Sequence, residues 1–252
     1  MCIRDRWWSA SLVVHNPRTN YRWLISGGNV GYGWLNQLGW VEHDVNDAAD
    51  FVITPFGKIA DWARRAVIYQ IFPDRFAKSN HTYELPAWAK PRNWDQHPEG
   101  RGPNTSFEYF GGDLWGVLDH IDYIAQLGAT CIYFTPIFPA GSAHRYDAQS
   151  FHTVDPLLGG DEALIALVEA AHSRGMKVIG DITLNHSGDT HEWFKSALAN
   201  DPQYRDFYTF NDALEHGYES WIGVKSLPKF NYTSPELREV LITGEDSVIR
   251  RW

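Results

Sequence analysis

The segment Asp161–Asp181, DEALIALVEAAHSRGMKVIGD, holds the clearest structural signal in the chain. Its first part has apolar residues at helical spacing, namely Leu164, Leu167, Val168 and Ala171. Gly175 ends this pattern, and Lys177–Asp181 then reads as a buried strand. The segment therefore predicts a helix that leads directly into a strand.

Two earlier segments repeat this order. Val67–Phe72 and Cys131–Phe134 are continuous apolar runs of strand length. Leu114–Leu127 has helical spacing between them, with Asp113 as a candidate N-cap and Gly128 after its end. Apolar strands that alternate with helices predict a parallel sheet covered by helices.

The first 60 residues have a different character. Ala10–His15, Tyr21–Ser26 and Asp50–Thr54 are short, β-rich runs separated by turn residues. About four such strands are too few for a complete sandwich of about seven. We expect residues 1–60 to be the C-terminal portion of an N-terminal β-domain. Met1–Arg6 fits no strand pattern, and we interpret it as non-native sequence or a frayed terminus.

Residues 61–252 are expected to form the α/β unit. An irregular aromatic stretch, 187–233, follows the third strand, and Ser234 and Pro235 then begin a helix whose apolar spacing continues to Trp252. A closed eight-stranded barrel needs about 250 residues of its own. With only three strands found, we expect a partial barrel in a chain cut at both ends.

Composition excludes several classes of protein. The net charge of −9 argues against a nucleic-acid partner. No apolar run approaches the ~18 residues of a membrane span, and no signal-peptide pattern opens the chain, so we expect no membrane contact and a cytoplasmic location. Two cysteines cannot form a disulfide scaffold. The chain has 12 Trp, 12 Tyr and 13 Phe, a weak indication of stacking on sugar rings.

Polar clusters lie where the predicted strands end. The candidate residues are Asp74 after the first strand, Asp113 before the first helix, His144, Tyr146 and Asp147 after the second strand, and Asp181, Asn185 and His186 after the third. The carboxyl ends of parallel strands meet at one edge, so we expect Tyr146, Asp147, Asp181 and His186 to converge. Such a group suits hydrogen bonding to a polyhydroxylated ligand.

Other interpretations of these clusters stay open at this point. Asp181, His186, Asp189 and His191 are candidate metal ligands of a metal-dependent hydrolase, although no His-Glu-x-x-His spacing is present. The same residues also fit a polar cluster that only holds the third strand in place. Asp74 and Arg75 are expected to form a structural ion pair rather than a catalytic acid.

Five motifs occur in the order of a known family. They are Tyr69–Phe76 (YQIFPDRF), Phe110–Leu114 (FGGDL), His144–Asp147 (HRYD), Asp181–His186 (DITLNH) and Leu227–Asn231 (LPKFN). Together they resemble the α-amylase superfamily, glycoside hydrolase family 13. The last motif is similar to the form typical of the neopullulanase, cyclomaltodextrinase and maltodextrin-glucosidase branch.

The resemblance implies a (β/α)8 TIM barrel with residues 187–233 as its inserted domain B. It implies that Tyr146 stacks on the sugar beside the scissile bond and that His186 hydrogen-bonds the 6-hydroxyl of that sugar. Asp147 and Asp181 are expected to orient neighbouring groups. His144 is a further expected substrate contact, and Asn185, Asp74 and Asp113 are expected supporting residues.

The resemblance also implies retaining hydrolysis of α-glucosidic bonds in maltodextrins, cyclodextrins or related α-glucans. A retaining glycosidase needs two carboxyl groups about 5 Å apart. In the family these follow later strands, so we expect no catalytic residue in this chain and no activity from it. A transglycosylase and a non-catalytic sugar-binding protein are the alternatives.

The expected partners are an α-glucan and, for the full-length protein, a second copy in a homodimer. No cofactor is expected. The loop Ala77–Asn80 lacks the set of Asn and Asp oxygens that binds calcium in some relatives, and Lys229 replaces the Asp of calcium-type fifth motifs. We therefore expect no metal, with calcium as the alternative, since the position of Asn185 can be a ligand in calcium-binding members of the family.

Overall fold

The computed structural model describes residues 9–27, 31–55 and 60–252. Met1–Arg6, interpreted above as non-native or frayed, lies outside the described residues. The chain divides into two compact units, residues 1–65 and 66–252. No helix in the described ranges has the length and apolar character needed to cross a membrane.

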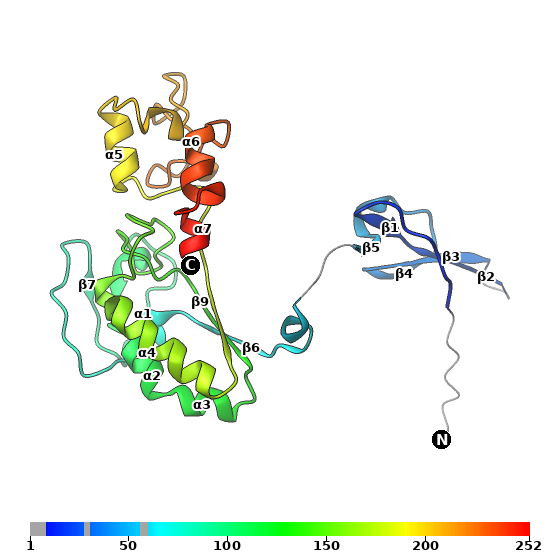
Figure 1. Cartoon of the computed structure of the whole chain (residues 1–252), viewed down its shortest axis with the longest axis horizontal. Coiled ribbons are helices and arrows are strands. Elements are labelled where there is room, and N and C mark those ends of the chain that lie inside the picture. Colours follow the sequence, from blue (N-terminus) through cyan, green and yellow to red (C-terminus); the bar gives the residue numbers. More distant parts are fainter. Residues whose placement is uncertain (1–8, 28–30, 56–59) are drawn as a thin grey trace. The chain divides into compact units, whose positions relative to one another are not determined.

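A parallel three-stranded sheet is the centre of the second unit (Figure 1). Its strands are β6 (Ile68–Ile71), β9 (Cys131–Phe134) and β10 (Lys177–Gly180), with β9 in the middle. All three predicted strands are therefore confirmed. Ile71 and Gly180 both pair with Phe134, so the three strands end level and their following loops leave from one edge.

Helices pack against this sheet as the apolar spacing predicts. They are α2 (Leu114–Asp119), α3 (Ile121–Gln126) and α4 (Gly160–Ser173). The expected helix 114–127 is in fact two helices, because the backbone leaves helical geometry at His120. Asp113 caps α2 by accepting a hydrogen bond from the Gly116 N–H at 2.6 Å. Their apolar faces and the strands share one aliphatic core, which includes Leu114, Val117, Ile124, Ile132, Phe134 and Leu167.

A second core lies in the later part of the unit. It is built around α5 (Glu192–Leu198) and the helices α6 (Pro235–Arg238) and α7 (Val248–Arg251) (Figure 1). Most of its side chains are aromatic, including Phe151, Trp193, Phe194, Phe207, Tyr208, Tyr218 and Phe230. Much of the predicted insertion 187–233 therefore packs in a core of its own rather than on the aliphatic one.

The predicted helix from Pro235 to Trp252 is wrong as a continuous element. Its start is confirmed, since the Ser234 hydroxyl accepts a hydrogen bond from the Leu237 N–H at 3.2 Å. After α6 the chain forms a π-helical segment, Glu239–Thr243, and Gly244 then becomes extended before α7 begins. A Cβ at Gly244 would lie 2.7 Å from the Glu239 carbonyl oxygen, so glycine permits this close turn.

The loop between β6 and α2 contains α1 (Pro73–Phe76) and a short parallel pair, β7 (Lys90–Pro91) and β8 (Glu108–Tyr109). The buried Glu108 carboxylate binds Arg92 at 2.5 Å and accepts from the Glu99 N–H at 3.0 Å. Burial alone would raise the pKa of Glu108, but the Glu99 hydrogen bond and then Arg92 lower it. This ion pair joins two distant parts of the long loop.

The first unit is β-rich, with two small antiparallel sheets. β1 (Thr19–Tyr21) pairs with β5 (Phe51–Ile53), and β2 (Trp23–Ser26), β3 (Tyr32–Asn36) and β4 (Gly39–Val41) form the other sheet. The expected strand Tyr21–Ser26 is divided at Arg22, whose guanidinium binds Asp50 at 2.7 Å. The expected strand Ala10–His15 is wrong, because this segment pairs with no strand among the described residues and Val13 is 79% exposed.

Candidate active site at the carboxyl edge of the sheet

Asp181 follows β10 and accepts two phenolic hydrogen bonds at one oxygen. Tyr146 donates to its Oδ2 at 2.8 Å, and Tyr133 on β9 donates to the same atom at 2.7 Å. Burial and this carboxylate raise the pKa of Tyr146 to about 12, so the phenol stays protonated near neutral pH. These two hydrogen bonds join β9 and the loop that follows it to the end of β10.

His186 joins the same two loops. Its Nε2 lies 3.1 Å from the Tyr146 carbonyl oxygen, so this nitrogen carries the proton and donates. Its Nδ1 accepts from the Asn185 side-chain amide at 3.1 Å. Burial lowers the pKa of His186, which keeps the ring neutral near pH 7. Both ring nitrogens are thus engaged with protein groups.

Asp147 closes the turn that presents Tyr146. It accepts hydrogen bonds from the Gly141 N–H at 3.1 Å and from the Ser142 hydroxyl. His144 Nδ1 accepts from the Tyr146 N–H at 3.1 Å, and burial lowers the pKa of His144 although Asp147 opposes this effect. The structure therefore brings together all four side chains expected to converge, with His144 and Asn185 beside them.

Arg145 supports this turn from inside. It is fully buried, its φ of 61° is left-handed, and its Nε binds Asp155 at 2.8 Å. A left-handed conformation costs a residue with a Cβ roughly 1–2 kcal/mol. The buried ion pair offsets that strain and holds the residues on either side in place. The sequence shows an arginine in the HRYD motif but nothing that marks it as buried.

The loops after β9 and β10 touch through their backbones. Gly188 N–H donates to the Ala148 carbonyl at 2.9 Å, and a Cβ at Gly188 would lie 2.4 Å from the Asp147 carbonyl oxygen. Only glycine permits so close an approach. It sets the position of His186 relative to Asp147.

Trp221 is a site residue that the sequence analysis did not identify. Its ring lies 5.8 Å from the His186 ring and is tilted by 37°. The side chain is 44% exposed, so part of an aromatic face is open beside the buried imidazole. Its place in an irregular stretch rich in aromatic residues offered no signal to single it out.

Asp74 and Asp113 make structural hydrogen bonds in the loop after β6. Asp74 forms the expected ion pair with Arg75 at 2.7 Å and accepts from the N–H groups of Phe110 and Gly111. Asp113 accepts from Ser79 at 2.5 Å and Tyr83 at 2.9 Å besides capping α2. Their recorded hydrogen bonds fix the long loop after β6 and do not reach Tyr146 or His186.

The alternative metal centre at Asp181, His186, Asp189 and His191 is not formed. His191 is fully buried between the rings of Phe151 and Trp193, and burial lowers its pKa to about 3. In the described part of the chain, no three His, Cys, Asp or Glu side chains gather as a metal site would require.

Known proteins are similar to this chain in sequence and structure. The catalytic domain of alpha-amylase matches residues 70–252. The maltogenic alpha-amylase of Bacillus acidopullulyticus is 32% identical over 94% of this chain and 41% of its own length. Neopullulanase 2 of Thermoactinomyces vulgaris is 32% identical over 99% of this chain and 43% of its own length.

Solved structures agree. The type III pullulan hydrolase from Thermococcus kodakarensis is 31% identical, with a TM-score of 0.65 over 82% of this chain and 41% of that protein. The chain thus spans about two fifths of the length of these relatives. Its sheet, its ordered motifs and these matches give one conclusion. The chain belongs to the alpha-amylase family, whose catalytic domain has a TIM-barrel-type fold.

Proposed function

We propose that this chain supplies substrate-binding contacts of a retaining glycoside hydrolase that acts on maltodextrins, cyclodextrins or related α-glucans. The observation that carries the proposal is the convergence of Tyr146, Asp147, Asp181 and His186 beside the exposed ring of Trp221. An aromatic face beside fixed polar groups is suited to a sugar ring. The names of the relatives, a maltogenic amylase and a neopullulanase, support the same class of substrate.

Each residue has a proposed task. Tyr146 stacks on the sugar, and His186 contacts its 6-hydroxyl, which requires the hydroxyl to share or replace the bond from Asn185. Asp181 and Asp147 hold Tyr146 and its turn, as their hydrogen bonds suggest. His144 lies at the same turn and is 33% exposed, which leaves it open to a substrate hydroxyl.

Bond cleavage is assigned to other carboxyl groups. Both oxygens of Asp147 accept protein hydrogen bonds, and two phenols donate to one oxygen of Asp181, Oδ2. These bonds give both carboxylates a positioning role, distinct from that of the nucleophile and the acid that a retaining mechanism needs. We propose that the catalytic pair lies on later strands of the full barrel, which makes the present three strands a partial (β/α)8 barrel.

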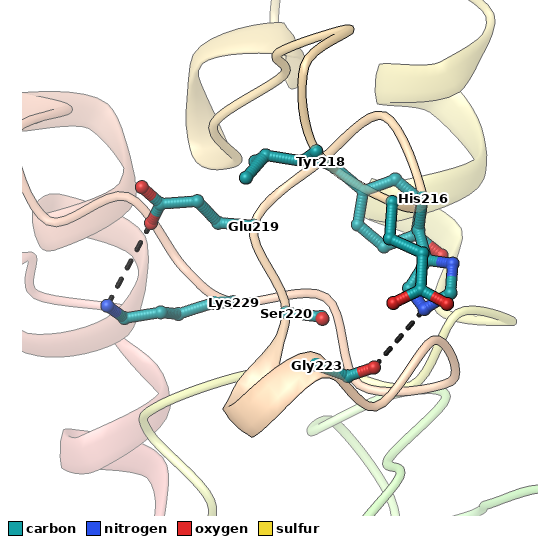
Figure 2. A pocket seen from close by; sticks show the side chains of 8 residues that line it. His216, Tyr218, Glu219, Ser220, Gly223 and Lys229 are labelled. Atoms are coloured by element: carbon teal, nitrogen blue, oxygen red, sulfur yellow. Dashed lines mark hydrogen bonds and ion pairs between the residues drawn. The ribbon is translucent and has the colours of Figure 1, made fainter.

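The remaining assignments follow the same family pattern. We propose that residues 187–233 are domain B and that residues 1–60 are the remnant of a β-sandwich. The full-length protein is proposed to be cytoplasmic and to form a homodimer. We propose no calcium requirement, because Lys229 stands where calcium-type members of the family carry an Asp, and its ammonium lies 3.8 Å from the Glu219 carboxylate (Figure 2).

Binding measurements on the 252-residue protein test the proposal. Isothermal titration with maltotriose should show binding that Tyr146→Ala and His186→Ala each weaken at least fivefold. Tyr123→Ala is the matched control, because Tyr123 is 51% exposed on α3, which precedes the amino-terminal end of β9, whereas the site follows the carboxyl ends of the strands. Equal maltotriose affinity of the wild type and both site variants would contradict the assignment. So would a wild-type affinity for cellobiose equal to that for maltotriose.

A further inference from the structure

Tyr133 lies on the face of β9 that turns away from the aliphatic core. Its neighbours Ile132 and Phe134 both belong to that core. Successive side chains of a strand point to opposite faces of the sheet, so the ring of Tyr133 lies on the other face, where its hydroxyl meets Asp181. Tyr133 therefore lies outside the layer in which the helices pack on the sheet.

Asp181 is held to β9 at two points. Its N–H donates to the Phe134 carbonyl at 3.0 Å, which continues the sheet by one residue beyond β10. Its carboxylate oxygen Oδ2 accepts from the Tyr133 hydroxyl at 2.7 Å. The first bond fixes the position of the Asp181 backbone, and the second fixes the direction of the side chain that leaves it.

Tyr146 uses the same oxygen that Tyr133 holds. Its hydroxyl donates to Oδ2 of Asp181 at 2.8 Å. A carboxylate oxygen has roughly two lone-pair sites, so two phenols at Oδ2 fill both of them. Because the Tyr133 hydroxyl takes one site, the Tyr146 hydroxyl is restricted to the other.

This restriction orients the Tyr146 ring, because the backbone of Tyr146 is held separately. Its N–H donates to His144 Nδ1 and its carbonyl accepts from His186 Nε2, each at 3.1 Å. With the backbone held there, the hydroxyl contact with Asp181 decides which way the ring points. The contacts therefore lead from the middle strand of the sheet, through one carboxylate, to an aromatic ring in the loop.

The protonation of both phenols agrees with this arrangement. The hydrogen bond to Asp181 is the main cause that raises the pKa of Tyr133, and burial and the same carboxylate raise the pKa of Tyr146 to about 12. Both phenols therefore keep their protons near neutral pH and donate to the carboxylate at the same time. Hydrogen bonds to an ionised acceptor are stronger than those between neutral groups.

We propose that Tyr133 is a positioning residue of the sugar site, which fixes the Asp181 carboxylate and through it the ring of Tyr146. The inference rests on the proposed function, because it takes Tyr146 to contact an α-glucan. Tyr133 itself makes no contact with the sugar and acts only through Asp181.

Isothermal titration of the 252-residue protein with maltotriose tests this role in a double-mutant cycle. Tyr133→Phe removes one oxygen atom and should weaken binding by about threefold or more, the scale of one hydrogen bond. Tyr146→Phe keeps the ring but loses its bond to Asp181, so adding Tyr133→Phe to it should weaken binding by less than about 1.5-fold more. A role in packing alone would cost the same factor in both backgrounds.

Tyr69→Phe is the matched control. It removes the same oxygen from the neighbouring strand β6, where the Tyr69 ring packs on the aliphatic core, and should keep maltotriose affinity within about twofold of the wild type.

A second measurement needs no sugar. In protein labelled with ¹³C in its tyrosine rings, the NMR signals that disappear in Tyr146→Phe belong to Tyr146. These signals should shift in Tyr133→Phe and stay in place in Tyr69→Phe.

The outcomes separate the two proposals. The positioning role is overturned if Tyr133→Phe binds maltotriose like the wild type, if the losses of the two single variants multiply in the double variant, or if the Tyr146 signals do not shift. If the wild type binds no maltotriose, the proposed function fails, and the Tyr146 signals alone then decide whether Tyr133 positions the ring.

Discussion

The aliphatic core under the sheet and the aromatic core around α5 differ in how they are built. The aliphatic core joins regular strands and helices through Leu114, Ile132, Leu167 and their neighbours. In the aromatic core, the ring pairs Trp193–Phe207 and Phe194–Tyr208 meet edge to face across short helices and loops, with centroids 5.5 and 4.9 Å apart. The candidate site draws on both, since Asp181 follows the sheet and Trp221 belongs to the loop region.

The aromatic core contains a buried titratable group, and this gives the largest expected difference between the cores. The pKa of His191 is about 3 in the folded protein and about 6.5 when unfolded. Between these values the unfolded chain binds the extra proton, so stability falls as the pH falls. At about 1.4 kcal/mol per pH unit, the loss by pH 3 is on the order of 5 kcal/mol.

His191→Asn tests this prediction. Asparagine is a good N-cap acceptor for the Trp193 N–H, which His191 Nδ1 now binds, and it does not titrate. Urea unfolding between pH 7 and 4 should show the wild type losing stability faster than the variant. Parallel pH profiles of the two proteins would mean that His191 is not held neutral by burial.

Truncation of one side chain in each core compares their packing. Phe194 is 1% exposed and contacts the rings of Tyr208 and Tyr218, so Phe194→Ala should lower the free energy of unfolding by about 3–5 kcal/mol. Leu167→Ala, in the aliphatic core, should cost about 2–5 kcal/mol. Urea titration followed by circular dichroism measures both. A cost below about 1 kcal/mol for Phe194→Ala would show that the aromatic cluster is loosely packed.

The close approach of the loops after β9 and β10 predicts a smaller change in the free energy of unfolding. In Gly188→Ala the new Cβ would start 2.4 Å from the Asp147 carbonyl oxygen, so the loops must separate. Overpacking of this kind costs about 1–3 kcal/mol. Thermal unfolding should detect this cost, and maltotriose affinity should fall as His186 moves away from Tyr146. Gly180→Ala is the control, because its Cβ would meet no atom within 4 Å.

Sequence reasoning succeeded where structure is set locally. The caps at Asp113 and Ser234 depend on residues within three positions, and the strands Ile68–Ile71 and Lys177–Gly180 lie in apolar runs that predict burial in a sheet. The expected strand Ala10–His15 failed because alternation alone does not supply a pairing partner.

The site likewise contains contacts that the sequence predicts and contacts that it does not. Level strand ends made the meeting of Tyr146 with Asp181 predictable, because the loops leave from one edge. The contact of Trp221 with His186 depends on how the irregular loop folds back, and no periodicity in the sequence predicts that fold. The break in the last helix at Gly244 likewise depends on a close approach to Glu239.

Arg145 gives the smallest expected difference in stability, because two substitutions separate the strain of its backbone from the loss of its ion pair. Arg145→Ala and Arg145→Gly both remove the partner of the buried Asp155 carboxylate. Glycine adopts the φ of 61° without strain and alanine does not, so the alanine variant should be less stable by about 1–2 kcal/mol. Chemical denaturation of the two variants measures this difference directly.

Both variants should also bind maltotriose more weakly than Arg145→Lys, which keeps the charge, if the ion pair positions Tyr146. Equal stability of the alanine and glycine variants would show that the turn relaxes once the guanidinium is gone, and the left-handed backbone would then be a consequence of the ion pair rather than a separate constraint.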